Sequence, residues 1–247
     1  MLTSDSTVST IKLLRANWSG TAYFSWSITD EYPRLDQNHT LILHPEECLR
    51  YASMKFERRR TSFLLGRYAA KKALSSYFDE SDLSTIAVLS GVFGQPVVHY
   101  LSSSCPIVTI SHASQAACAI ASPDVHPMGL DLESIDAAKS EAIKSQMTSD
   151  ELGFLLGSTA SDITGLTMMW SAKEALSKIL MCGLMCPFEL LAIRSLSQNE
   201  AYYEGEYLNF HQYKFQSWVM EAAVCTIAFP RRTQIEIDMT LFLEALT

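Results

Sequence analysis

Alternating apolar and polar residues near the start of the chain predict β-structure. Residues 9–30 contain short alternating runs, among them Thr21–Ile28, as half-buried strands do. Between residues 58 and 78, apolar residues recur at helical spacing, which predicts a long amphipathic helix. A shorter helix should begin at His44–Pro45, because proline and the acidic residues after it are favoured in a first helical turn.

The middle of the chain carries three short apolar runs that predict strands. They cover Ile107–Ile110, Cys118–Ala121 and Met128–Glu133. A turn marked by Gly91, Gly94 and Pro96 precedes the first run, and prolines separate the last two.

The second half begins with helical patterns and ends with strand patterns. We expect one helix over residues 137–157, with a cap at Thr148–Glu151, and a long helix over residues 166–182 that Gly183 and Pro187 end. Three strands should follow: Leu190–Arg194, Ala201–Tyr207 and Trp218–Phe229. This order predicts an α+β protein of two halves joined near residues 122–128, which we place at 1–124 and 125–247.

Composition is that of an ordinary globular protein. Of 247 residues, 48% are hydrophobic and 19% charged, and no apolar run is long enough to cross a membrane. The N-terminus lacks a basic segment leading into an apolar one, so we expect no secretory signal and a cytoplasmic location. The six cysteines should then be reduced. The only close pair, Cys182 and Cys186, is expected to serve packing, because no further ligands complete a zinc site.

Charge excludes a general nucleic-acid binder, since the formal net charge is −8. One segment departs from this balance: residues 50–72 carry eight basic residues against the single acid Glu57. Such a segment suits an anionic ligand or an acidic partner. A solvated helix face explains it equally well.

Asp131 and Glu133 form the sharpest local feature. Residues two apart on a strand point to the same face, so the two carboxylates project together. They repel each other unless a cation or protons intervene, and hard oxygen ligands of this kind suit magnesium. An acid pair at a strand edge is also commonly just solvated.

The expected long helix carries Glu174 and Lys178 one turn apart, where they can form a surface ion pair. Lys173 points elsewhere around the helix and could reach another part of a bound anion. Ser111 and His112 follow a buried strand, a place where sites often form, although a lone histidine is more often structural. Nucleophile elbows, metal-ligand histidine pairs and dinucleotide or Walker fingerprints are absent from the sequence.

Taken together, these segments resemble the larger, Sfp-like class of 4′-phosphopantetheinyl transferases. The resemblance extends over about residues 43–228. The elements that carry it are Arg59–Arg67, Gly94-Gln95-Pro96, Ile110-Ser111-His112, Gly129–Glu133 and Trp170–Lys178. The last fits the pattern W-x-x-K-E-A-x-x-K at every defined position. The resemblance implies a pseudo-twofold arrangement of two similar α+β halves, with coenzyme A bound in the cleft between them.

The same resemblance implies a role for each candidate residue. Asp131, Glu133 and Glu174 would hold Mg²⁺, Glu174 would also serve as or orient the base, and Lys178 would neutralise phosphate oxygens. Further coenzyme contacts would come from the remaining candidates: Lys173, Ser111, His112, Arg59 and Arg67.

The implied enzyme is a magnesium-dependent transferase of the holo-[acyl-carrier-protein] synthase type. It would move the phosphopantetheine arm of coenzyme A onto a serine of an apo acyl or peptidyl carrier protein and release 3′,5′-ADP. Its pathway would be fatty-acid, polyketide or nonribosomal-peptide biosynthesis. We expect a monomer that binds neither nucleic acid nor membrane.

Three departures from the family pattern matter. Gln95 stands where lysine is common, Ala113 replaces the usual serine with Ser114 one place later, and the phosphate contact could be Arg58, Arg59 or Arg60. Two alternatives therefore stay open: a non-catalytic member of this fold that binds coenzyme A or a carrier, and a metal-dependent phosphohydrolase.

Overall fold

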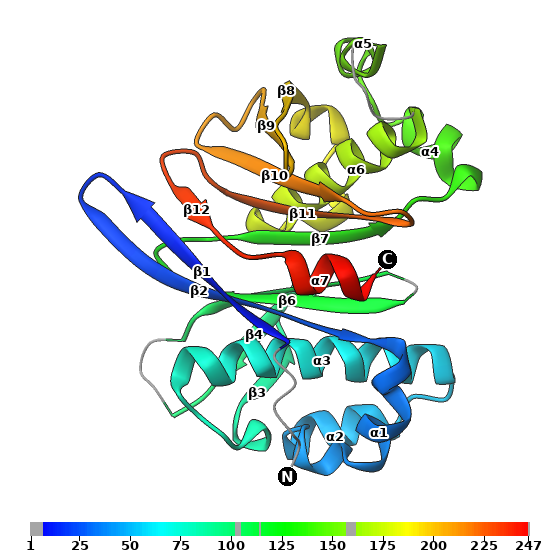
Figure 1. The fold of residues 1–247 in the computed structure, drawn as a ribbon. Coiled ribbons are helices and arrows are strands. Elements are labelled where there is room, and N and C mark those ends of the chain that lie inside the picture. Colours follow the sequence, from blue (N-terminus) through cyan, green and yellow to red (C-terminus); the bar gives the residue numbers. More distant parts are fainter. Residues whose placement is uncertain (1–6, 102–104, 114, 157–161, 247) are drawn as a thin grey trace. The chain divides into compact units, whose positions relative to one another are not determined.

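The computed structural model describes residues 7–101, 105–113, 115–156 and 162–246, which form two compact units (Figure 1). The first unit comprises the chain up to Pro127 together with Gln234–Leu246, and the second comprises Met128–Thr233. The unit boundary thus lies three residues after the predicted one. The C-terminal segment, which the sequence placed in the second half, joins the first unit because β12 (Gln234–Glu236) pairs with β1 (Val8–Arg15).

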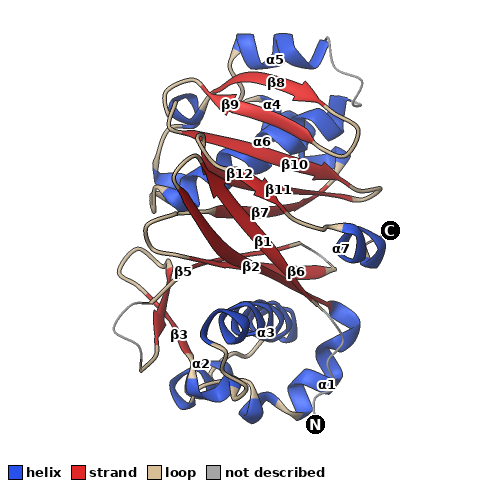
Figure 2. Ribbon diagram, turned by 60° about the vertical axis from the view of Figure 1, so that its left-hand side comes forward, coloured by secondary structure: helices blue, strands red, loops and turns tan. Residues whose placement is uncertain are grey.

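A five-stranded antiparallel sheet with a long helix on it forms the first unit. The sheet has the order β12-β1-β2-β6-β5, with β2 at Trp18–Ile28, β5 at Ile107–His112 and β6 at Ala116–Ser122. Helix α3 (Glu57–Phe78) lies across one face of this sheet (Figure 2). The strand and helix predicted for this part of the sequence are confirmed.

Smaller elements complete the first unit. They are α1 (Tyr32–Gln37), α2 (Pro45–Ala52), the hairpin of β3 (Ala87–Ser90) and β4 (Pro96–His99), and the C-terminal α7 (Thr240–Ala245). Helix α2 begins where His44–Pro45 predicted, with His44 as its N-cap. The ring of Phe242 in α7 packs edge-on against Phe24 and Trp26 of β2, so the C-terminus is held on the sheet by aromatic contacts.

The second unit repeats the plan of a sheet and a long helix. Its antiparallel sheet has the order β7-β11-β10-β9-β8. The strands are β7 (Gly129–Ser134), β8 (Ile193–Gln198), β9 (Tyr203–Tyr207), β10 (Tyr213–Val219) and β11 (Ala223–Pro230). Helix α6 (Asp162–Ile179) packs on β7, β11 and β10 (Figure 1). The predicted α+β class with two α+β halves is confirmed.

Some predicted boundaries in the second unit are wrong. Instead of one helix over residues 137–157, the described chain has a 3₁₀ turn, α4 (Ser140–Lys144) and α5 (Ser149–Leu156), because Thr148 starts a new helix; residue 157 lies outside the described residues. The strand predicted at Leu190–Arg194 begins only at Ile193, as β8, because a 3₁₀ turn occupies Phe188–Leu191. Helix α6 ends at Ile179, before the predicted stop at residue 182.

Each unit has its own apolar core. In the first, alanines of α3 such as Ala69 and Ala73 pack on Ala119 and Ala121 of β6, and small residues let the helix approach the sheet closely. In the second, the core contains residues of α6 and the contacting aromatic rings of Tyr207 and Phe215. Among the described residues, no helix is long and apolar enough to cross a membrane.

Candidate functional site

The candidate site lies where β7 and α6 pack against each other in the second unit. A Cβ atom on Gly129, at the start of β7, would lie 1.9 Å from the carbonyl oxygen of Ala175 in α6. Only glycine permits that approach, because it has no Cβ. The close packing sets the strand that carries Asp131 and Glu133 against the helix that carries Glu174.

Lys178 joins this helix to the strand directly. Its ammonium group donates to the carbonyl oxygen of Leu130 at 2.7 Å and to the Asp131 carboxylate at 2.9 Å. The Asp131 side chain is only 5% exposed, while that of Lys178 is 26% exposed. Lys178 thus forms its ion pair with the strand and keeps part of its side chain open to solvent.

Glu133 is held by an aromatic side chain of α6. The indole N–H of Trp170 donates to its carboxylate at 3.2 Å, and Lys139 lies 3.8 Å away on the exposed side. Burial and the neighbouring Asp131 raise the pKa of Glu133, and Lys139 and the Trp170 hydrogen bond oppose that rise. The Trp170 ring in turn stacks on Phe188, with centroids 4.7 Å apart and planes 8° apart.

The charges of Asp131 and Glu133 both act on Glu174. Burial, then the charges of Asp131 and Glu133, raises the pKa of Glu174 to about 7, and the nearby Lys178 ammonium limits the rise. The charges of the three carboxylates therefore influence one another, which disfavours full ionisation of the group.

Magnesium is the cation that the resemblance implies, and the residue types fit it. Asp131, Glu133 and Glu174 would hold it, since they offer hard oxygen ligands and their repulsion already raises the pKa values of Glu133 and Glu174. Within the described part of the chain, no three His, Cys, Asp or Glu side chains are gathered closely enough to enclose a metal ion. Metal binding would therefore require these carboxylates to reorient.

Lys173, predicted to contact a phosphate, lies in the interior instead. Its side chain is 0% exposed and donates to Glu151 at 2.9 Å and to the carbonyl oxygen of Gln146 at 3.0 Å. Glu151 is equally buried and also accepts from the backbone N–H groups of Thr148 and Ile193. The pair fastens α5 and the start of β8 to α6.

Comparison with known proteins identifies this part of the chain. The family model of the 4′-phosphopantetheinyl transferase superfamily matches residues 127–228. Residues 127–228 belong to that superfamily. The match contains Asp131, Glu133, Glu174 and Lys178, and none of the curated proteins matches the chain significantly.

Two solved structures are similar to part of the chain. One is a holo-(acyl-carrier-protein) synthase from Bacillus anthracis in complex with CoA (3′,5′-ADP), with 22% identity and a TM-score of 0.38, covering 44% of this chain and 95% of that one. The other is the holo-ACP-synthase from Plasmodium yoelii, with 16% identity and a TM-score of 0.33, covering 47% of this chain and 91% of that one.

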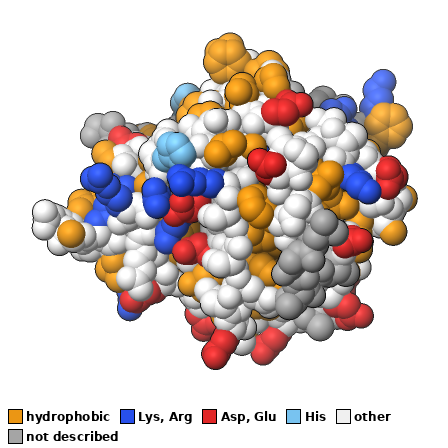
Figure 3. Space-filling view, turned by 90° about the horizontal axis from the view of Figure 1, so that it is seen from above, with side chains coloured by type: hydrophobic (Ala, Val, Ile, Leu, Met, Phe, Trp, Pro, Cys, Tyr) orange, Lys and Arg blue, Asp and Glu red, His pale blue; other side chains and the backbone are white. Residues whose placement is uncertain are grey.

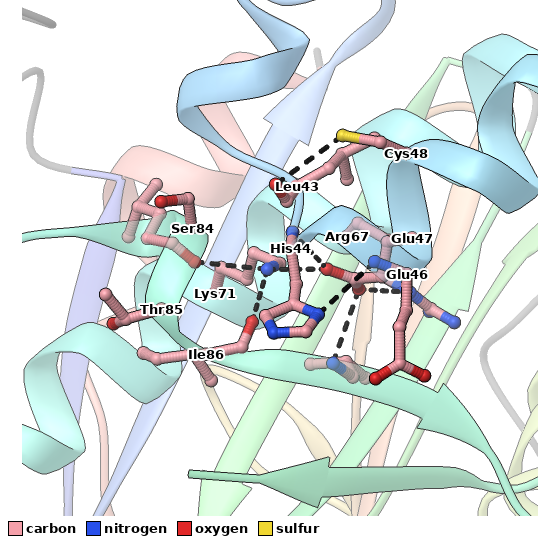
Figure 4. A network of polar contacts seen from close by, with 12 residues as sticks. Leu43, His44, Glu46, Glu47, Cys48, Arg67, Lys71, Ser84, Thr85 and Ile86 are labelled. Carbon is pink, nitrogen blue, oxygen red and sulfur yellow. Dashed lines mark hydrogen bonds and ion pairs between the residues drawn. The ribbon is translucent and has the colours of Figure 1, made fainter. Parts of the chain in front are cut away.

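Part of the basic segment that suggested phosphate binding makes internal contacts in the first unit. Arg67 and Lys71 both bind the buried carboxylate of Glu47, with an Arg67 distance of 3.0 Å (Figure 4). The Arg67 side chain is 11% exposed and lies over the Phe63 ring. Arg60 binds Asp36 at 3.0 Å. The segment is therefore not one continuous basic surface.

Arg59 keeps the exposure that a phosphate contact needs. Arg58 and Arg59 are exposed in the first turn of α3, where no structural partner distinguishes one from the other. His112 is exposed at the end of β5, and Ser111 before it is buried. Ser114, the displaced serine of the family pattern, lies outside the described residues. On the face that Figure 3 shows, basic side chains gather beside acidic ones toward the left, and other acidic side chains lie scattered.

Sequence reasoning missed the buried glutamates Glu47 and Glu151. Each sits three residues after the capping residue, His44 and Thr148 respectively, and accepts a hydrogen bond from that residue's backbone N–H. This is the spacing of a capping box. The spacing was visible in the sequence, but it does not say that the carboxylate will also bind a buried lysine.

Proposed function

We propose that the protein transfers the phosphopantetheine arm of coenzyme A to a serine of an apo acyl or peptidyl carrier protein, with Mg²⁺, and releases 3′,5′-ADP. Two findings support this: the superfamily match over residues 127–228 and the cluster of three carboxylates with Lys178 inside it. The observation that carries the proposal is the Lys178 ammonium group, which bonds the Leu130 carbonyl oxygen at 2.7 Å and the Asp131 carboxylate at 2.9 Å on the strand that also carries Glu133.

Each residue of the cluster has a distinct task. Bound Mg²⁺ would supply charge neutralisation at the phosphates. Glu174, on the helix beside Asp131 and Glu133, would accept the proton of the carrier serine or orient the base that does. The partly exposed Lys178 side chain is placed to stabilise charge on phosphate oxygens. Phosphoryl transfer needs positioning and electrostatic stabilisation more than covalent chemistry, so the cluster needs no nucleophile of its own.

We retain Arg59, Ser111 and His112 as proposed coenzyme contacts. For Arg67 and Lys173 we propose a structural role instead, because buried glutamates already bind them. The six cysteines are free thiols, in keeping with the proposed cytoplasmic location, and we propose that the protein acts as a monomer.

The test is a transfer assay with a panel of apo carriers, coenzyme A and Mg²⁺, read by the mass gain of one phosphopantetheine arm. Asp131→Asn keeps the shape of the side chain and removes its charge, so we expect a loss of transfer of about 100-fold or more. Asp150→Asn, an exposed position in α5, is the matched control and should transfer normally.

Other outcomes would favour other functions. Binding of coenzyme A without transfer to any carrier would indicate a non-catalytic member of the fold. Release of phosphate or nucleotide from coenzyme A without an acceptor would indicate a phosphohydrolase. Near-normal transfer by Asp131→Asn would contradict the assignment of Asp131 to the site.

A further inference from the structure

The chain leaves α6 through a tightly bonded cap. Met181 adopts a left-handed conformation with φ of 54°. The backbone N–H of Met181 donates to the carbonyl oxygen of Lys178 at 3.3 Å, and that of Cys182 to the carbonyl oxygen of Ser177 at 3.2 Å. These two bonds make a Schellman motif. Cys182 is thereby fixed to the helical turn that carries Lys178.

A second cysteine lies against Cys182. The chain turns back after Cys182, with the Met185 N–H donating to the Cys182 carbonyl oxygen at 3.1 Å, and the Cys186 thiol lies close enough to raise the pKa of the Cys182 thiol. The Cys182 thiol also donates to Ser177 at 3.8 Å and the Cys186 thiol to the Pro187 carbonyl oxygen at 3.7 Å. Two free thiols that lie close together on one tight turn are suited to form a disulfide, which joins residues whose Cα atoms are about 4.4–6.8 Å apart.

Short paths join this pair of thiols to the carboxylates. Along the chain, Cys186 is followed by Pro187 and then Phe188, whose ring stacks on Trp170; Trp170 donates to Glu133. Through space, the charge of Glu174 acts on the Cys182 thiol. A change at the thiols can therefore affect two of the three carboxylates: Glu133 through the stacked rings of Phe188 and Trp170, and Glu174 through its charge.

We propose that Cys182 and Cys186 form a reversible regulatory disulfide, and that its formation disturbs the carboxylate site; the regulatory part rests on the transferase function proposed above. A disulfide would draw Cys186 toward the fixed Cys182 and shift Phe188 with it. The stacked Trp170 would then move relative to Glu133. The oxidised protein would bind Mg²⁺ and transfer the arm less well.

The oxidant is a peroxide. The hydrogen bond of the Cys186 thiol lies at the exposed surface, whereas that of the Cys182 thiol is partly buried. The sulfur of Cys186 therefore attacks hydrogen peroxide and becomes a sulfenic acid with release of water. The sulfur of Cys182 then attacks that sulfur, the S–S bond forms, and the hydroxyl leaves with the Cys182 proton as a second water. Two thiols are oxidised and one peroxide is reduced to two waters. A dithiol reductant reverses the step.

Burial, Cys186 and Glu174 raise the pKa of Cys182, so little of it is thiolate at neutral pH. Because thiolates are the reactive form, the attack of Cys182 on the oxidised Cys186 should be the slow step, and we expect the disulfide to form over minutes to hours rather than seconds. Slow formation suits a response to sustained oxidation.

The experiment treats the full chain with hydrogen peroxide, alkylates the remaining thiols and maps the peptides by mass spectrometry. We expect a cross-linked pair of peptides containing Cys182 and Cys186, and four thiols still alkylated. Oxidation should change tryptophan fluorescence and lower the transfer rate by about 2- to 30-fold, the usual range of such couplings. Dithiothreitol should restore both.

Three variants separate the causes. Cys182→Ser and Cys186→Ser should lose the oxidation response and keep the reduced protein's transfer rate. Cys48→Ser is the matched control, since Cys48 is also partly exposed and its thiol also bonds a backbone carbonyl; this variant should respond as the wild type does. Oxidation elsewhere, or a mapped disulfide with no change in fluorescence and transfer rate, would overturn the proposal.

The transferase function and the regulatory disulfide would fail in different ways. If the reduced protein transfers nothing to any carrier, the transferase function fails, while the disulfide map and Mg²⁺ binding by calorimetry still test the coupling. If the reduced protein is active and Cys182 and Cys186 stay separate under peroxide, only the disulfide is refuted.

Discussion

The two units hold the same buried ion pair at corresponding places, and only one of them carries the carboxylates. In the first unit Glu47 of α2 binds Lys71 of α3 and accepts from the backbone N–H of Val88. In the second unit Glu151 of α5 binds Lys173 of α6 and accepts from the backbone N–H of Ile193. Each glutamate thus joins a short helix, a strand segment and the long helix.

The two long helices also end alike. Lys71 lies eight positions before Asp79, and Lys173 lies eight positions before Met181; Asp79 and Met181 are the described non-glycine residues with positive φ. The residue directly after each of them, Glu80 or Cys182, donates its N–H back to a serine carbonyl oxygen, that of Ser75 or Ser177. The correspondence indicates that both units were built from one structural plan.

The two long helices differ at positions next to these shared features, and the proposed active site lies at one of them. At the position of Lys72 in α3, directly after the buried lysine, α6 has Glu174. At the position of Arg67, which gives Glu47 a second cation, α6 has the buried Met169. The first unit thus has more charged side chains in its interior, whereas the second unit has charged side chains beside β7. The scaffold and the proposed active site occupy neighbouring but different positions of the same helix.

The largest difference we expect is between Lys173→Met and Lys71→Met. Removing Lys173 leaves the buried Glu151 without a cation, which costs about 3–5 kcal/mol. Removing Lys71 leaves Arg67 on Glu47, so the loss should be smaller, about 1–3 kcal/mol. Urea unfolding, with hydrogen exchange followed separately in each unit, measures both. Equal losses, or a larger loss for Lys71→Met, would show that Arg67 does not substitute for the lysine.

A second contrast concerns the glycines at the two helix–sheet contacts. A Cβ atom on Gly129 would meet a backbone oxygen at 1.9 Å, whereas one on Gly66 would meet only the side chain of Ile110, at 3.2 Å. Gly129→Ala should therefore cost about 3 kcal/mol or more. Gly66→Ala should change stability by less than about 1 kcal/mol, because alanine's helix propensity offsets the mild contact. Comparable losses in thermal unfolding would contradict the role given to Gly129.

The two units should respond to pH in opposite directions. Burial and Arg15 lower the pKa of His126 in the first unit to about 4, so the unfolded chain binds more protons and the unit loses up to about 3 kcal/mol as pH falls from 6.5 to 4. Burial and neighbouring carboxylates raise the pKa of Glu174 in the second unit to about 7. That unit should therefore lose stability as pH rises from about 4.5 to 7 in metal-free buffer.

Hydrogen exchange of each unit as a function of pH separates the two responses. His126→Gln should flatten the first unit's acid response, and Glu174→Gln should flatten the second unit's response between pH 4.5 and 7. Each variant serves as the control for the other, because the two groups lie in different units. Parallel pH responses in both units, unchanged by either substitution, would refute these assignments.

The sequence predicted the elements of this comparison better than the contacts. Hydrophobic spacing located α3 and α6, and the acid pair located Asp131 and Glu133, because short-range patterns record which faces are buried. The sequence could not show that the side chains of Lys71 and Lys173 are buried, since lysine is almost always exposed unless it is paired. Their partners lie about two dozen residues upstream, and pairing at that distance depends on the tertiary fold.

The smallest effect we expect separates the two helix ends. Left-handed backbone strains most residues with a Cβ, but aspartate and asparagine tolerate it better. Met181→Gly should therefore stabilise the second unit by up to about 1 kcal/mol, and Asp79→Gly should change the first unit by less. Thermal unfolding of the reduced protein measures both, with Gly183→Ala as a control that adds strain at φ of 48°. If Met181→Gly gave no gain, the methionine would have to stabilise the cap through side-chain contacts. The turn that fixes Cys182 would then depend on that side chain as well as on the two backbone hydrogen bonds.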